Sequence, residues 1–230
     1  GGANDIPLPD PLIWMAYVAA RTSTIKLATG ILILPQHNPV ITAKQIATLD
    51  LMSTGRIIIG VGVGWLAEEF DALGADFSTR AARTDEYIAA MRVLWSDEAP
   101  TFDGEFVQFK GAYCRPQPVN SAVPIVVGGH ARAAARRAGR LGDGFFPARG
   151  ISEELLRLAR DTCEENGRDP DALEITASLP ADLKEIPHLA DLGVSRILVP
   201  VAPMPDMATW IKNPDDALAW KDHLDRYRDL

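Results

Sequence analysis

The sequence predicts an α/β fold in which parallel strands alternate with helices. Six runs rich in Ile and Val are apolar throughout, as expected for parallel strands that are covered on both faces. A helical stretch follows each run, and this strict alternation is typical of open doubly wound sheets and of (β/α)8 barrels. The predicted strands cover residues 25–34, 56–64, 124–129, 144–148, 173–179 and 196–201.

Short signals mark the ends of the predicted helices. An N-cap residue followed by proline at the first helical position predicts a helix start. Glycine is expected where a helix stops. The starts lie at Asp10-Pro11, Asn38-Pro39 and Asn213-Pro214, and the stops at Gly55 and Gly142.

One segment departs from the alternation of strands and helices. Residues 101–118, TFDGEFVQFKGAYCRPQP, alternate in polarity around a turn and predict an inserted β-hairpin. No linker or low-complexity run divides the chain, so we expect one domain over residues 1–230.

The first predicted element is a helix, DPLIWMAYVAARTS at residues 10–23. A (β/α)8 barrel needs eight strands. A barrel interpretation therefore expects that the first strand, its helix and the second strand are missing before Gly1.

Composition narrows the class of protein. The 230 residues carry a net charge of −8 with no basic tail, which argues against nucleic acid and anionic membranes as main partners. Cys114 and Cys163 lie far apart without the spacing of a metal site, so we expect a reduced cytoplasmic protein and no metal. The start of the chain does not resemble a signal peptide, and its apolar runs are too short to cross a bilayer.

The stretch GVGVGWLA at residues 60–67 contains Gly62-x-Gly64-x-x-Ala67, which matches the dinucleotide-binding fingerprint. That fingerprint also requires a second strand ending in an acid, whereas the following residues are helical through Trp95 and carry Asp85 inside the helix. A tight exit from the strand explains the glycines better. Whether this loop contacts a ligand is left open by the pattern.

The stretch VPIVVGGHARAAARRAGRLGDGFF places Gly128-Gly129-His130 between a strand and a helix. Bare glycine amides and the positive end of the helix dipole predict an anion site. His130 could donate to the anion or lie at the surface. Ala134, Ala138 and Leu141 are expected to pack on the sheet. Most of Arg132, Arg136, Arg137 and Arg140 are expected to be solvated on the outer face of the helix.

Gly30 interrupts an otherwise aliphatic strand, which indicates either a packing bulge or the close approach of a ligand. His37 in the loop beyond it could face a substrate or be solvated. No Ser-His-Asp set, zinc set or paired-carboxylate site is evident.

Taken in order, several of these motifs resemble the luciferase-like monooxygenase superfamily, and within it the oxidoreductases that use the deazaflavin coenzyme F420. The motifs are IKLATGILILPQHNPVITAKQIATLDLMSTGRIIIGVGVGWLAEEF, RTDEYIAAMRVLW, FDGEFVQF, PIVVGGH and LADLGVSRILV. The resemblance covers nearly the whole chain. It implies a (β/α)8 barrel with a flavin or deazaflavin at the carboxyl ends of the strands.

The resemblance also implies which residues bind the cofactor. Thr29, Gly30 and Ile31 would form a bulge behind the ring, with a cis peptide bond between Gly30 and Ile31. The loop of Gly62, Val63, Gly64 and Trp65 and the turn of Gly128, Gly129 and His130 would serve the ribityl and phosphate portion. The phosphate would lie against the amides of Gly129 and His130. No catalytic residue is assigned, because the family's substrate-facing acids and histidines belong to the segment expected before Gly1.

The expected activity is hydride transfer between F420 and a small organic substrate. The alternatives are an FMN-dependent monooxygenase on the same barrel, a non-catalytic flavin-binding or scaffold protein, and a phosphate-ligand barrel such as an isomerase. A homodimer is also implied, and the helix over 38–54 offers Ile46, Leu49 and Met52 along one side for contact between the subunits.

Overall fold

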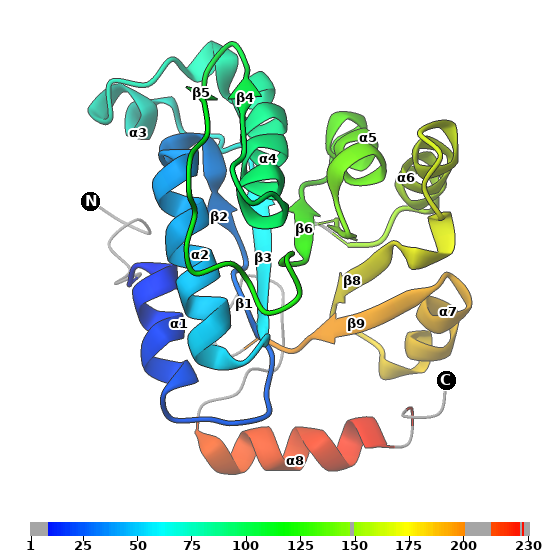
Figure 1. Ribbon diagram of the computed structural model, residues 1–230. Helices are drawn as coiled ribbons and strands as arrows, with labels where there is room; N and C mark the ends of the chain where they lie inside the picture. Colours follow the sequence, from blue (N-terminus) through cyan, green and yellow to red (C-terminus); the bar gives the residue numbers. More distant parts are fainter. Residues whose placement is uncertain (1–8, 148–149, 201–212, 226, 228–230) are drawn as a thin grey trace. The chain divides into compact units, whose positions relative to one another are not determined.

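The computed structural model describes residues 9–147, 150–200, 213–225 and 227 (Figure 1). The chain divides into two compact units, Gly1–Val126 and Val127–Leu230. The boundary lies inside strand β6 (Ile125–Gly128), and each unit is described by itself.

The first unit begins, in its described part, with a helix and continues with strands and helices in alternation. Its elements are α1 (Pro11–Ala19), β1 (Leu27–Ala28), β2 (Leu32–Ile33), the 3-10 turn η1 (Leu34–Gln36), α2 (Pro39–Ser53), β3 (Ile57–Gly62), α3 (Ala67–Ala72), η2 (Phe77–Thr79), α4 (Arg80–Ser96), β4 (Phe102–Asp103) and β5 (Gln108–Phe109).

The second unit repeats the same alternation. After β6 come α5 (Arg132–Leu141), β7 (Gly144–Phe146), α6 (Glu153–Glu165), η3 (Pro170–Ala172), β8 (Glu174–Ser178), η4 (Leu183–Glu185), α7 (Ile186–Asp191), β9 (Val194–Leu198) and α8 (Pro214–Asp225).

The described strand pairs of the main sheet are parallel, which confirms the predicted α/β class. The hydrogen-bonded order is β1-β3-β6-β7-β8-β9, and β2 also pairs with β3. In the first unit β1 and β2 both run parallel to β3, and in the second unit β7, β8 and β9 run parallel to one another. Parallel neighbours joined by helical crossovers are the repeating unit of a β/α barrel.

Helix caps in the first unit follow the predicted signals. Asp10 accepts a hydrogen bond from the amide of Ile13 at 2.9 Å, and Asn38 accepts from Val40 and Ile41 at 3.0 and 3.2 Å. Gly55 follows the end of α2 with φ +80°, a conformation that glycine adopts easily. The two N-caps fix where α1 and α2 begin.

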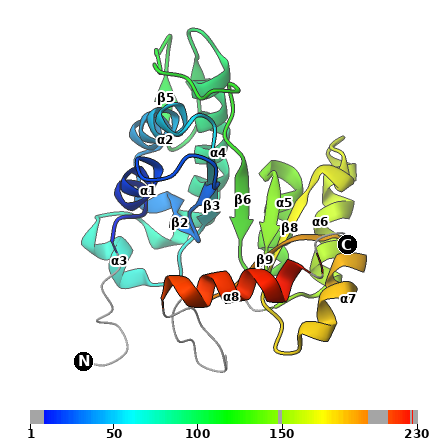
Figure 2. The ribbon, with the colours of Figure 1, turned by 90° about the horizontal axis from the view of Figure 1, so that it is seen from below.

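The core of the first unit lies between β3 and the helices α2 and α4. Every residue of β3 is buried, and the fully buried Trp95 of α4 donates from its indole Nε1 to the carbonyl of Ala43 in α2 at 3.0 Å. Helices α1 and α2 lie side by side in both views (Figures 1 and 2). This packing gives β3 and its neighbours a fixed support.

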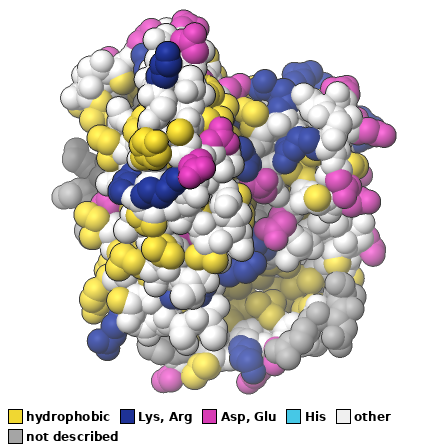
Figure 3. Space-filling view, in the orientation of Figure 1, with side chains coloured by type: hydrophobic (Ala, Val, Ile, Leu, Met, Phe, Trp, Pro, Cys, Tyr) yellow, Lys and Arg dark blue, Asp and Glu magenta, His cyan; other side chains and the backbone are white. Residues whose placement is uncertain are grey.

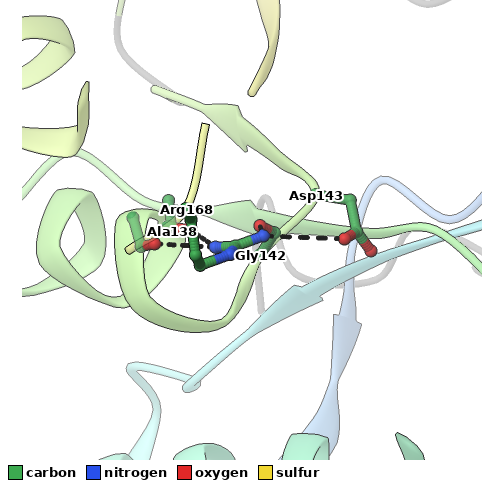
Figure 4. A network of polar contacts seen from close by, with 5 residues as sticks. Ala138, Gly142, Asp143 and Arg168 are labelled. Atoms are coloured by element: carbon green, nitrogen blue, oxygen red, sulfur yellow. Dashed lines mark hydrogen bonds and ion pairs between the residues drawn. The ribbon is translucent and has the colours of Figure 1, made fainter. Parts of the chain in front are cut away.

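In the second unit α5 packs against α6, and Arg168 closes the end of α5 (Figure 4). Its guanidinium donates to the carbonyls of Ala138 at 3.3 Å, Gly139 at 2.7 Å and Gly142, and lies 3.7 Å from a carboxylate oxygen of Asp143. The last carbonyls of a helix lack partners within the helix. Arg168 therefore satisfies the end of α5 where Gly142 terminates it.

Three expectations from the sequence need correction. The predicted strand 25–34 is split into β1 and β2, because residues 29–31 leave the pairing with β3. The predicted hairpin is confined to β4 and β5, which pair antiparallel, and residues 110–118 contain no strand. The strand predicted at 196–201 begins at Val194 and ends at Leu198, and Val201 lies outside the described residues.

The arginine helix α5 is largely as expected from the sequence. Arg132, Arg136 and Arg140 are exposed, but Arg137 is only 6% exposed, so it does not belong to the solvated face. Positions 134, 135, 138 and 139 are also buried, so position 137 falls on the edge of the packed stripe of the helix.

Candidate functional site

The first unit contains a β-bulge at the place where Gly30 interrupts the strand. Ala28 pairs with Ile58 and Leu32 pairs with Val61. Three residues (29–31) therefore lie opposite only two (59–60) on β3, which is the count that defines a bulge. The peptide bond between Gly30 and Ile31 is cis, as the resemblance implied.

Thr29 anchors the bulge to β3. It is 5% exposed, its hydroxyl donates to the carbonyl of Gly60 at 2.7 Å, and its amide donates to the carbonyl of Ile58 at 3.3 Å. A threonine side chain thus replaces part of the backbone ladder that the extra residue disrupts.

Ile31 lies over two glycines of β3. A Cβ atom at Gly62 would collide with Cδ1 of Ile31. A Cβ at Gly60 would collide with the carbonyl oxygen of Thr29 and lie 3.3 Å from Cγ2 of Ile31. Both glycines are therefore required by the bulge itself, independently of any ligand.

Gly30 is different from the glycines beneath it. It is exposed, and a Cβ built on it would meet no heavy atom within 4 Å other than those of its chain neighbours Thr29 and Ile31. Nothing in the chain around it therefore demands glycine for lack of space. Ile31 beside it keeps 37% of its surface exposed. The bulge thus presents a bare stretch of backbone next to a branched apolar side chain, and this suits the flat face of a ring.

The loop after β3 is fixed by packing on both sides of Trp65. Gly64 has φ +80°, and a Cβ there would lie 2.8 Å from Cγ2 of Ile33 and 2.8 Å from Cε2 of Phe70. Phe70 of α3 is fully buried and packs edge-on against Phe77 with ring centroids 5.3 Å apart. Val63 is half-buried, whereas Trp65 is 80% exposed.

His37 borders the groove between α1 and α2. This groove of about 370 Å³ is also lined by Asp10, Lys44, Leu49 and Met52. Burial lowers the pKa of the His37 imidazole below its usual value, and Asp10 raises it by a smaller amount. His37 is accordingly uncharged at neutral pH, and the groove that it lines belongs to the outer helices.

In the second unit the strand β6 ends in the predicted glycine turn. Gly129 has φ +140°, which glycine tolerates and other residues rarely adopt. Its amide donates to the carbonyl of Phe146 at 3.0 Å. A Cβ at this position would lie 2.8 Å from Cβ of Ala134. Gly129 therefore shapes the turn, and its amide already has an acceptor.

The turn leads directly into the amino end of α5. Ala131 is the N-cap residue and its side chain offers no hydrogen bond, so the first-turn amides of Arg132 and Ala133 have no acceptor within the helix. His130 is exposed beside them. Such a helix start favours an anion through its amides and its dipole.

Arg132 is the cation nearest in sequence to this helix start. Its guanidinium forms an ion pair with Glu154 of α6, and both side chains are more than half exposed. An exposed pair of this kind contributes little to stability and leaves the arginine able to exchange partners.

The residues present fit a flavin or deazaflavin in two respects. The open backbone face at Gly30 fits a flat ring, and the uncapped start of α5 fits a phosphate group. The described residues hold no cluster of three or more potential metal-ligating side chains. No helix among them is long and apolar enough to span a membrane.

Gly60 is a site residue that the sequence pattern alone does not distinguish. Its carbonyl accepts from Thr29, and its missing side chain makes room for the bulge. The only sequence signal is the spacing of Gly60, Gly62 and Gly64 along the exit of β3, which does not separate the role of Gly60 from that of the other two.

Comparison with known proteins agrees with this geometry. Residues 1–191 match the family model described as luciferase-like monooxygenase. The chain is 34% identical over 222 residues to an uncharacterised protein of Mycobacterium tuberculosis, covering 94% of this chain and 74% of that protein. It is 32% identical to an F420-dependent glucose-6-phosphate dehydrogenase of Kineococcus radiotolerans, covering 94% of this chain and 66% of the relative.

Among solved structures, an F420-dependent secondary alcohol dehydrogenase in complex with an F420-acetone adduct has a TM-score of 0.68 and 25% identity. The match covers 81% of this chain and 60% of the solved chain. The chain described here thus spans between three fifths and three quarters of the length of these proteins.

Proposed function

The chain belongs to the luciferase-like monooxygenase family, and from this premise we propose that it is an oxidoreductase using the deazaflavin coenzyme F420. It would transfer a hydride between that coenzyme and a small organic substrate. The names of the Kineococcus relative and of the solved alcohol dehydrogenase support F420 as the cofactor.

The observation that carries the proposal is the open face at Gly30. Gly60, Gly62, Gly64 and Gly129 each make room for other atoms of the chain, whereas a Cβ at Gly30 would meet no heavy atom beyond its chain neighbours. A bulge that exposes bare backbone is an expected place for a ligand to approach closely. We assign the bulge of Thr29, Gly30 and Ile31 to the ring of the cofactor.

The start of α5 is the proposed position of the cofactor's phosphate. The amides of Arg132 and Ala133 and the exposed His130 are the groups available there, with Gly128 and Gly129 shaping the approach. Because the amide of Gly129 already donates to Phe146, it contributes shape and not a hydrogen bond. The loop of Gly62, Val63, Gly64 and Trp65 is assigned to the ribityl portion.

When bound, the deazaflavin supplies the hydride chemistry, and the protein supplies position and electrostatics. Thr29 holds the bulge in register through Gly60, so the backbone at Gly30 keeps its place. Ile31 offers an apolar wall that excludes water from one side of the ring. No described residue is assigned the proton transfer.

Separate titrations with F420 and with FMN test this function, with tryptophan fluorescence as the readout. We expect F420 to bind at least about tenfold more tightly than FMN, a difference of about 1.4 kcal/mol. The opposite order would favour an FMN-dependent enzyme, and the family description names a monooxygenase activity. Binding of neither would overturn the proposal and leave a non-catalytic role.

A homodimer in the cytoplasm is also proposed. Cys114 and Cys163 are both unpaired and buried, which is in keeping with a reducing compartment. Ile46 and Leu49, expected from the sequence to face a partner, are instead buried inside the first unit, and only Met52 of that set is exposed, at 69%.

The proposed contact with a second copy lies over α1, where hydrophobic side chains gather beside the polar and basic side chains of α2 (Figure 3). Ile13, Trp14 and Tyr17 of α1 are 73%, 55% and 64% exposed, and α1 carries no charged residue. Light scattering at micromolar concentration should give twice the chain mass, and Trp14→Glu should give the chain mass. A monomeric parent protein would count against the dimer.

A further inference from the structure

Helix α5 carries a row of exposed arginines, Arg132, Arg136 and Arg140, which we call the arginine row. Residues four apart lie on the same side of an α-helix, about 6 Å from one another along its axis. The helix contains no acidic residue, and dark blue side chains gather over it in the space-filling view (Figure 3). The row is therefore a local concentration of positive charge on a chain whose net charge is −8.

The arginine row is unfavourable for the helix that carries it. Like charges four residues apart repel one another, and the row contains two such pairs. Arg132 is also the first residue of α5, where the helix dipole favours an anion and opposes a cation. Of the three arginines, Arg140 in the last turn has the charge that the dipole favours. The stability of α5 thus gives no reason for the row as a whole, whereas an anionic ligand would.

The contact between Arg132 and Glu154 indicates which kind of anion the row accepts. Arg132 forms an ion pair with this carboxylate of α6, and both side chains are more than half exposed. An exposed pair contributes little to stability, so another carboxylate can replace Glu154 at small cost. The planar guanidinium group binds a carboxylate through two parallel hydrogen bonds. A ligand that carries several carboxylates along a chain therefore fits the row.

We propose that the arginine row binds the oligo-γ-glutamate tail of coenzyme F420. This inference rests on the proposed F420-dependent function. Beyond its phosphate the coenzyme carries a lactyl group and a chain of γ-linked glutamates, and each glutamate has a free carboxylate. The phosphate is proposed to lie at the start of α5, so the tail begins beside Arg132 and continues along Arg136 and Arg140.

The arginine row also gives the chain a means of preferring F420 to FMN. FMN ends at its phosphate and has no carboxylates to pair with the row. Each exposed pair between an arginine and a carboxylate should tighten binding by a factor of about two to five. Pairing of the tail is intramolecular once the phosphate is bound, so the contributions of successive glutamates accumulate. Because exposed charges are screened by salt, this gain should disappear at high ionic strength.

The test uses F420 without glutamates and F420 with a tail of several glutamates. Each form is titrated by calorimetry at about 0.1 M and about 1 M salt, where screening is weak and strong respectively. The proteins are the parent, Arg136→Glu, Arg136→Lys and Arg21→Glu. Arg136 lies in the middle of the row, one turn away from the proposed phosphate position. Arg21 is the matched control, because it is an exposed arginine of the first unit and undergoes the same change of charge.

We expect the parent protein to bind the form with glutamates about tenfold more tightly at low salt, and within about twofold of the other form at high salt. Arg136→Glu should reduce the gain from the tail by about threefold or more and leave the affinity for the form without glutamates within about twofold. Arg136→Lys retains the positive charge and should keep most of the gain. Arg21→Glu should match the parent.

The possible failures are distinguishable from one another. If neither form of F420 binds, the proposed function is wrong and this inference falls with it. Equal affinity of the parent for both forms at low salt overturns the tail assignment and leaves the cofactor assignment standing. A gain from the tail that Arg136→Glu does not reduce places the tail elsewhere. An equal loss in Arg21→Glu assigns the gain to the net charge of the protein and overturns the role of the row.

Discussion

The two glycine-rich strand exits of this chain are built in different ways. At the bulge in the first unit, side chains hold the backbone, with Thr29 bonded to Gly60 and Ile31 lying over Gly62. At the turn in the second unit, Gly129 has φ +140° and its amide bonds to the carbonyl of Phe146, so the backbone holds itself.

The difference matches what each exit is proposed to bind. A flat apolar ring is recognised by a shaped surface, which requires side chains packed beneath a bare backbone. An anion is recognised by free backbone amides and by the positive end of a helix dipole. Both are available where a turn leads directly into the first residues of a helix. Each of the following substitutions changes either the bulge of the first unit or the turn and helix start of the second unit.

Gly129→Asp should have the largest effect. The substituted residue would be forced into a conformation that side chains rarely adopt and would press against Ala134. We expect the free energy of unfolding to fall by about 3 kcal/mol, measured by urea denaturation. F420 affinity should fall more than about tenfold, and Gly129→Ala should show the stability loss without the added charge. Unchanged F420 affinity in the Asp variant would contradict the anion assignment.

Gly62→Ala should destabilise the first unit by about 2 kcal/mol, because the new methyl group would collide with Ile31. The double variant Gly62→Ala with Ile31→Ala should recover part of that loss, since the second change removes the colliding atoms. If the two single changes in the free energy of unfolding, measured by urea denaturation, simply add in the double variant, Ile31 is not the reason why position 62 is glycine.

Thr29→Val should cost about 1 kcal/mol of stability. It keeps the shape of the side chain but removes the buried hydrogen bond from the hydroxyl to the carbonyl of Gly60. Thr29→Ser retains the hydroxyl and should restore most of the difference in thermal or urea unfolding. Equal stability of the Val and parent proteins would contradict the anchoring role of Thr29.

Ala131→Asp and Ala131→Ser should have small effects on stability, and both should stabilise. Each supplies the missing N-cap of α5 and should add about 0.5–1 kcal/mol. Only the aspartate adds negative charge beside the proposed phosphate, so only it should weaken F420 binding. Equal F420 affinity in the two variants would contradict the proposed position of the phosphate at the start of α5.

Much of the fold follows from local sequence signals. The N-caps Asp10 and Asn38 fix the starts of α1 and α2, and the apolar run over β3 predicts a strand that is buried along its whole length. These features depend on neighbouring residues, so a single sequence contains the information needed to predict them.

Features that depend on contacts between distant residues are less accessible from the sequence. Gly30 indicates a bulge, but the need for Gly60 arises only when the carbonyl of Thr29 lies over it, and the need for Gly62 only when the side chain of Ile31 does. Arg137 is buried although Arg132, Arg136 and Arg140 are exposed, because position 137 lies at the edge of the packed face of α5. Likewise, Ile46 and Leu49 are apolar residues of α2 whose burial inside the unit depends on the helices packed around them.

The central claim is that the open face at Gly30 receives the ring of the cofactor, and Gly30→Ala tests it most directly. Apart from its chain neighbours Thr29 and Ile31, a Cβ at this position meets no heavy atom within 4 Å, so the free energy of unfolding should change by less than about 1 kcal/mol. The same methyl group would stand between the backbone and the ring, so the dissociation constant for F420 should rise by about tenfold or more. An unchanged dissociation constant in a stably folded Gly30→Ala protein would contradict the claim.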